Sequence, residues 1–122
     1  MKRTVTALAA ALFASLAIAL GAGNAAAVTT DQYDRVRYMW CGDGVAELEY
    51  TNSYGNTSTE VHDMSQGCRF YDFTETDEYG GYVSAWIVDD NGGRVSCTIW
   101  RNGVIVAKSN DTTDYYSYAG CY

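Results

Sequence analysis

Four cysteines are the residues of this chain whose chemistry is most predictable. Cys41, Cys68, Cys97 and Cys121 follow one another at spacings of 27, 29 and 24 residues. Zinc sites are built from closely spaced pairs such as Cys-x-x-Cys, so these spacings predict no metal site. An even number of cysteines in a short secreted chain instead predicts a disulfide framework, and four cysteines leave three connectivities open.

The chain offers little for catalysis. His62 is its only histidine, and Asp63 follows it directly. Adjacent residues of a strand point to opposite faces, so Asp63 would not orient the His62 ring. A nucleophile needs a base and an orienting group in one place, and no Gly-x-Ser-x-Gly or similar motif is present. We therefore expect a protein without catalytic residues or cofactors, and not an enzyme.

Carboxylates are abundant but have a simple interpretation. Asp43, Glu47 and Glu49 are expected on the outward face of a strand, and the acidic run from Asp72 to Glu78 is expected to be a solvated turn. Calcium sites need clustered oxygen ligands, and no Asp-x-Asp-x-Asp-Gly loop is present. A carboxylate pair of the glycosidase type stays open as an alternative.

Tyrosines near the C-terminus give the best indication of binding. Tyr115, Tyr116, Tyr118 and Tyr122 crowd around Cys121. Tyr116 and Tyr118 are expected on one strand face, with Tyr115 on the other. Aromatic side chains supply rigid contact area for protein partners, so we predict a partner-binding surface here. The alternative is ordinary packing over a disulfide.

A second candidate surface lies at a tight turn. Trp100 and Arg101 precede Asn102-Gly103, and Trp and Arg are frequent hot spots of interfaces. The pair resembles the Trp-Arg turn of small secreted two-disulfide β-proteins that inhibit amylases, although a Tyr follows there and Asn102 follows here. This resemblance implies, as an alternative function, an inhibitor of an extracellular hydrolase.

The N-terminus predicts export. Lys2 and Arg3 precede an apolar run from Ala7 to Leu20, and small residues with an Ala-x-Ala pattern follow up to Ala27. These are the parts of a secretory signal peptide, here residues 1–27 with an apolar signal helix. The competing interpretation is an uncleaved membrane anchor, which would reach the required length of about 20 residues only by including polar and glycine positions.

The remaining chain, residues 28–122, has the size of one domain. Of the eight basic residues, Lys2 and Arg3 lie in the signal segment, which leaves six against fifteen Asp and Glu. An acidic chain without a basic stripe is not expected to bind nucleic acid or anionic lipid, so a membrane is involved only if the first segment stays uncleaved. We expect the protein to be secreted or held at the cell envelope.

Alternating apolar and polar residues predict an all-β domain. Val36, Tyr38 and Trp40 share one face of the first strand, and a polar lead from Val28 to Gln32 precedes it. Hairpins are predicted at Asp90–Gly93 and, most strongly, at Asn102–Gly103. About eight antiparallel strands arranged as a β-sandwich or small barrel are expected, at residues 34–40, 45–51, 57–61, 68–73, 82–89, 94–101, 104–108 and 115–121.

The order of several motifs resembles a known family. Residues 38–50 are similar to a Tyr-x-x-x-Gly-x-Gly-x-Ala-x-ϕ-x-Tyr opening, and residues 93–107 are similar to a Gly-x-ϕ-x-Cys-x-Ile-x-x-x-Gly-x-ϕ-ϕ segment that a late cysteine, Cys121, follows. Both belong to the mycobacterial membrane protein small (MmpS) family. The resemblance covers residues 36–121, but the family's mid-domain Pro-Trp is missing because the chain has no proline.

The resemblance has implications for fold, disulfides and function. It implies an immunoglobulin-like β-sandwich of about seven to eight strands and a disulfide between Cys97 and Cys121, and with it a second disulfide between Cys41 and Cys68. In the family this domain follows a membrane helix and assists an exporter of lipids or siderophores. We therefore expect a non-enzymatic interaction module with a protein partner, which on this resemblance would be a membrane exporter.

Overall fold

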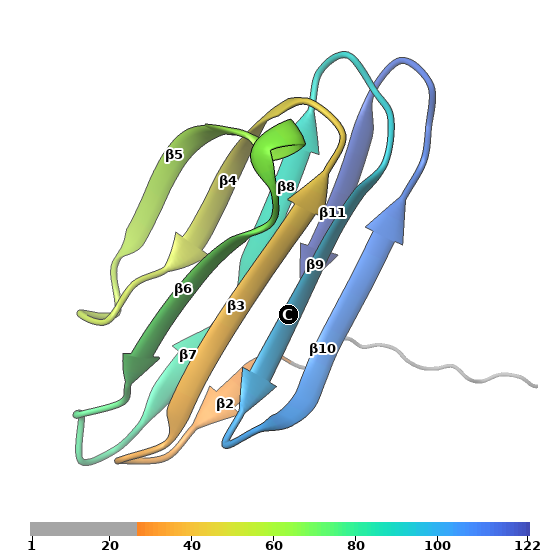
Figure 1. Cartoon of the computed structure of the whole chain (residues 1–122). Helices are drawn as coiled ribbons and strands as arrows, with labels where there is room; N and C mark the ends of the chain where they lie inside the picture. The colour runs from red at the N-terminus through yellow and green to blue at the C-terminus, as the bar shows by residue number, and fades with distance from the viewer. Residues whose placement is uncertain (1–26) are drawn as a thin grey trace, which may run out of the picture.

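The computed structural model of this chain describes residues 27–122, so the predicted signal peptide lies, apart from Ala27, outside the described residues. The described part is an all-β sandwich. A front sheet of order β10-β9-β3-β6 packs against a back sheet of order β11-β8-β4-β5, and a two-stranded sheet, β2-β7, lies at one end (Figure 1). The elements are β2 (Val28–Thr30), β3 (Arg35–Gly42), β4 (Val45–Thr51), β5 (Thr57–Asp63), the 3-10 helix η3 (Met64–Gln66), β6 (Arg69–Thr74), β7 (Gly81–Val83), β8 (Ala85–Asp89), β9 (Val95–Arg101), β10 (Val104–Asp111) and β11 (Ser117–Cys121).

The predicted alternation of β3 and β4 is confirmed. Val36, Tyr38 and Trp40 of β3 point into the sandwich and are at most 2% exposed. Leu48 and Tyr50 of β4 face them from the back sheet and are also buried. Because side chains of a strand alternate between faces, burying one face of each strand leaves the charged residues between them in solvent.

Aromatic rings make up much of the core. The ring of Tyr38 lies 5.6 Å from that of Trp40 and 5.9 Å from that of Tyr50, and it stacks on Tyr71 at 6.0 Å. The Tyr38 hydroxyl donates a hydrogen bond to the Thr51 carbonyl oxygen at 2.7 Å. Burial raises the pKa of Tyr38, so this phenol stays neutral. The hydrogen bond to Thr51 satisfies its buried hydroxyl.

Both disulfides implied by the family resemblance are confirmed. Cys97 of β9 and Cys121 of β11 are bonded across the interior and connect the two sheets. Cys41 of β3 is bonded to Cys68, the residue before β6, within the front sheet. In a domain this small, such cross-links supply stability that the core alone provides only marginally.

Residues 27–122 form ten strands where seven or eight were expected. The segment Val28–Gln32 was interpreted as a polar lead, but Val28–Thr30 forms β2, and Val28 and Thr30 are buried. The predicted strand 82–89 is two strands, because the backbone at Ser84 turns to pair with Thr51. As a result β7 pairs with β2, whereas β8 pairs with β11 and β4.

The predicted hairpin at Asp90–Gly93 is wrong. The strands on either side of it, β8 and β9, belong to different sheets, so this segment arches across the edge of the sandwich. The Asp89 side chain is buried and accepts a hydrogen bond from the amide of Asn91, which starts the turn. A Cβ at Gly92 would overlap the Asp114 carbonyl, so the arch needs glycine at this position.

The predicted hairpin at Asn102–Gly103 is confirmed. It joins β9 to β10, with Arg101 opposite Val104, and both turn residues have positive φ, 53° and 83°. Asn102 also connects this turn to β3. Its amide donates to the Arg35 carbonyl oxygen, and its Oδ1 accepts from the Arg35 amide, each at 2.8 Å.

Candidate functional site

The predicted binding residues lie on opposite outer faces of the sandwich. Trp100 is on β9 and, by strand alternation, projects from the outer face of the front sheet. Tyr118 is on β11 and projects from the outer face of the back sheet. The two candidate surfaces are therefore separate, and a partner that contacts one of them does not need to contact the other.

The outer face of β11 carries a compact aromatic group. The ring of Tyr118 lies 6.1 Å from that of Trp86 on the neighbouring strand β8. The hydroxyls of Tyr118 and Tyr122 are 3.0 Å apart. They lie directly over Gly120, where an added Cβ would be 2.6 Å and 2.8 Å from the two oxygens. Glycine at this position therefore allows both phenols to lie flat across the strand.

Carboxylates border this aromatic group. Glu49 of β4 lies opposite Trp86 of β8, and Glu47 lies opposite Val88, so both carboxylates share the outer face with the rings. Burial, the hydrogen bond to Tyr122 and nearby negative groups raise the pKa of Tyr118 to about 12. We call the surface formed by Trp86, Val88, Tyr116, Tyr118 and Tyr122, with Glu47 and Glu49 beside it, the tyrosine face.

The other two predicted tyrosines are in the loop before β11. Tyr116 is 54% exposed and Tyr115 is 87% exposed. The phenol of Tyr116 lies close enough to Tyr118 to contribute to the raised pKa of Tyr118. Tyr115, in contrast, projects into solvent. Of the four predicted tyrosines, three thus belong to one surface.

Trp86 is the member of the tyrosine face that sequence reasoning missed. In the sequence it lies in the apolar stretch with Val83, Ala85 and Ile87, and it was not among the predicted binding residues. Trp86 lies between Ala85 and Ile87, which are both fully buried, so strand alternation directs its side chain to the opposite, outer face. This alternation was the available signal in the sequence. Its proximity to Tyr118 depends on the pairing of β8 with β11 and could not be read locally.

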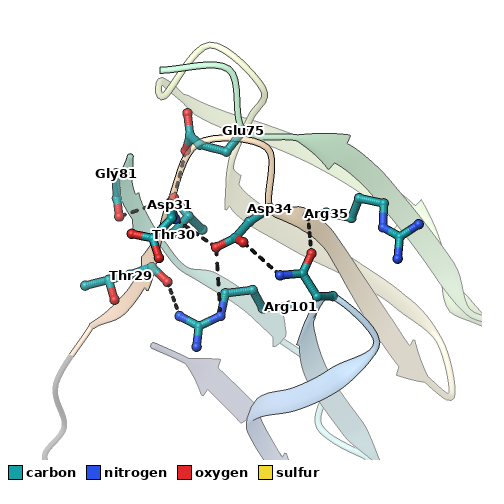
Figure 2. A network of polar contacts seen from close by, with 9 residues as sticks. Thr29, Thr30, Asp31, Asp34, Arg35, Glu75, Gly81 and Arg101 are labelled. Atoms are coloured by element: carbon teal, nitrogen blue, oxygen red, sulfur yellow. Dashed lines mark hydrogen bonds and ion pairs between the residues drawn. The ribbon is translucent and has the colours of Figure 1, made fainter. Parts of the chain in front are cut away.

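Arg101 is directed toward its own domain. Its Nη1 donates to the Thr29 carbonyl oxygen at 2.6 Å, and its Nε lies 4.0 Å from an oxygen of Asp34 (Figure 2). Asp34 also accepts a hydrogen bond from the side-chain amide of Asn102 at 2.7 Å. These contacts attach β2 to the β9–β10 turn, so Arg101 acts as a structural residue in this conformation.

Trp100 borders a hollow in the outer face of the front sheet. The hollow has a volume of about 670 Å³. Its lining residues come from β3, β6 and the β9–β10 hairpin: Arg35, Val36, Arg37, Asp72, Phe73, Thr74, Trp100 and Gly103.

Two of the remaining polar candidates, Asp63 and Glu75, have structural partners. The Asp63 carboxylate caps η3 by accepting from the amide and hydroxyl of Ser65, at 3.0 Å and 2.6 Å. Glu75 accepts from the Thr30 hydroxyl at 2.8 Å, which joins the acidic loop to β2 (Figure 2). Within residues 27–122 no three His, Cys, Asp or Glu side chains are grouped so that they could hold a metal ion.

In the part of the chain that the structure describes, no helix is long and apolar enough to cross a membrane. No family model, curated protein or solved structure matches the chain.

Proposed function

We propose that this protein is a secreted or envelope-associated, non-enzymatic interaction module that binds a protein partner through the tyrosine face. The observation that carries the proposal is the arrangement of Trp86, Tyr118 and Tyr122 side by side on an outer sheet face. Such exposed aromatic groups are typical of interface hot spots, because they bury large area at low cost in side-chain entropy.

The charge of this face indicates the kind of partner. Glu47 and Glu49 lie beside the rings, and strand alternation places no basic residue of β4, β8 or β11 on this face in the described chain. A partner surface with exposed Lys or Arg would gain both charge attraction and cation–π contacts with the tyrosines. This complementarity also increases the rate of encounter at low ionic strength.

An MmpS-like role, accessory to a lipid or siderophore exporter, is the narrower form of the proposal. Trp40 lies opposite Cys97 in the β3–β9 register, so a buried Trp packs next to the disulfide that connects the sheets. This packing supports an immunoglobulin-like character for the core. Two disulfides are also typical of proteins that function in an oxidising compartment outside the cytoplasm.

Inhibition of a secreted hydrolase is the second candidate function. It would use the hairpin around Trp100, which borders the hollow in the front sheet. The engagement of Arg101 with Thr29 and Asp34 makes this hairpin a poorer contact surface than the tyrosine face. Replacing Trp100 by Ala should abolish inhibition of a hydrolase if this second function holds.

Site-specific photocrosslinking in the producing cells tests the proposal. A benzophenone amino acid at Tyr116 should give one predominant crosslinked protein, and the same group at Tyr54 serves as the control. Tyr54 is 86% exposed in the β4–β5 turn, so it matches Tyr116 in type and is more accessible than it. A membrane exporter as the crosslinked product would support the accessory role. Equal crosslinking from both positions would reject the tyrosine face as the binding surface.

A further inference from the structure

The front sheet carries a positive outer face on an acidic molecule. Strand alternation and register place Arg35, Arg37 and Lys108 on this face. Among the outward positions of β3, β6, β9 and β10, Asp72 is the single carboxylate in the described chain. The field at this face therefore attracts anions, whereas the tyrosine face repels them.

One of the three cations is already neutralised. The Nε and Nη2 atoms of Arg37 donate to the two carboxylate oxygens of Asp72, at 2.7 Å and 3.0 Å. Its guanidinium also lies 5.3 Å from the centre of the Phe70 ring. The hydrogen bond and the charge of Arg37 lower the pKa of Asp72, so this pair stays ionised and holds its geometry.

Arg35 has no such partner. Among residues 27–122 it is the only arginine whose guanidinium forms no ion pair with a carboxylate. Figure 2 shows its side chain directed away from the network around Asp34 and Arg101. Asn102 forms hydrogen bonds with both the backbone amide and the carbonyl oxygen of Arg35. The backbone from which this unpaired side chain extends is therefore fixed.

Arg35 lines the hollow of about 670 Å³ next to Trp100. Pockets for small molecules have volumes of this order and combine apolar walls with a few polar groups that orient the ligand. Here Trp100 supplies apolar surface, and Arg35 supplies an unpaired planar cation. Guanidinium groups bind planar oxyanions through two parallel hydrogen bonds.

We propose that this hollow binds a small organic anion whose planar apolar body lies against Trp100 and whose carboxylate or similar oxyanion pairs with Arg35. The site is separate from the tyrosine face and does not depend on the function proposed for it. An extended acidic polymer fits the observations less well. It would need a row of unpaired cations, but Arg37 is neutralised, Asp72 repels a second anion, and Lys108 lies outside the lining.

Two matched probes, 2-naphthoate and 2-naphthamide, test this proposal by isothermal titration calorimetry. They share one apolar body and differ in charge. The protein is the disulfide-bonded form purified from the producing cells. Two variants, Arg35→Gln and Lys108→Gln, each remove one exposed cation from the same sheet face, but only Arg35 lines the hollow.

We expect 2-naphthoate to bind with a Kd below about 1 mM and at least about tenfold more tightly than 2-naphthamide, because a hydrogen-bonded charge pair adds at least that factor. Arg35→Gln should remove this advantage, whereas Lys108→Gln should change the Kd by less than about twofold. Equal binding of the two probes, equal losses in the two variants, or no binding of 2-naphthoate at millimolar concentration would each overturn the proposal.

Discussion

Cys97 of β9 and Cys121 of β11 are joined by a disulfide that connects the two sheets through the core, and both residues are at most 1% exposed. Cys41 and Cys68 are joined within the front sheet, where Cys41 is half-buried and Cys68 is exposed. The two bridges close loops of similar length, 24 and 27 residues. They therefore constrain the unfolded chain almost equally but differ in what their removal does to the folded state.

Removing the inner bridge should destabilise the domain more than removing the outer one. On the chain-entropy model either loss costs about 3.5 kcal/mol. The double substitution Cys97→Ala and Cys121→Ala also leaves a cavity between the sheets, which adds about 1 kcal/mol or more. Urea unfolding, compared with Cys41→Ala plus Cys68→Ala as the matched control, measures the difference. Equal losses would mean that burial of the inner bridge adds nothing.

The β9–β10 turn depends on Asn102 in two ways. Its φ of 53° is unfavourable for most residues, and its side chain bonds the Arg35 amide and Asp34. Asn102→Gly keeps the backbone conformation and loses only the side-chain bonds, so a loss of about 1 kcal/mol in the free energy of unfolding is expected. Asn102→Ala should lose about 2 kcal/mol, because it adds backbone strain. Chemical denaturation distinguishes the two, and an alanine variant as stable as the glycine variant contradicts the strain argument.

Acid should weaken the contact between β10 and β11. The Asp111 carboxylate accepts hydrogen bonds from the amide of Tyr118 at 3.0 Å and the hydroxyl of Thr113 at 2.7 Å, and these lower its pKa below the ordinary 3.8. A lowered folded-state pKa means that its contribution to stability is present above about pH 4 and is lost as pH falls through the folded value.

Asp111→Asn should therefore flatten the decline of stability with falling pH below about pH 5. Melting temperatures between pH 7 and pH 3 provide the measurement. Glu78→Gln, in the exposed loop after β6, is the control that removes one carboxylate without touching β11. If both variants lose stability in acid as steeply as the wild type, Asp111 does not carry this pH dependence.

Alkali should affect the tyrosine face. The pKa of Tyr118 is raised to about 12 by burial and by the hydrogen bond with Tyr122. Because the folded state keeps this proton above the ordinary pKa of 10, stability should fall as pH rises between about 10 and 12. Tyr122→Phe should move the pKa of Tyr118 back toward 10, as followed by ultraviolet absorbance of phenolate. An unchanged titration midpoint would show that the hydroxyl pair is absent in solution.

The state of the N-terminus can be read from the intact mass of the protein in medium and envelope. A species that starts at Val28 in the medium, four hydrogens lighter than the reduced chain, is expected if residues 1–27 are cleaved and both bridges form. A full-length species confined to the envelope would indicate an anchor and would favour the exporter-accessory role over a diffusible binder.

Local patterns account for the parts of the fold that were predicted correctly. The alternation in β3 and β4 and the Asn102–Gly103 hairpin depend on neighbours in the chain, through side-chain parity and positive φ. The arch at Asp90–Gly93 was mistaken for a hairpin because both use the same turn residues. Which sheet β9 joins is decided by its long-range pairing with β3, and no local signal contains that choice.

The sequence by itself determined the all-β class, the buried faces of β3 and β4, four paired cysteines and a tyrosine-rich C-terminus. These features can be read from composition and from the two-residue alternation of strand side chains, which are local properties of the chain. Tertiary structure alone decided that Trp86 lies beside Tyr118, that Arg101 is directed toward Asp34 and Thr29, and that Arg35 stays unpaired next to Trp100. These relationships arise where strands distant in sequence become neighbours, and the sheet order that makes them neighbours results from packing of the whole core.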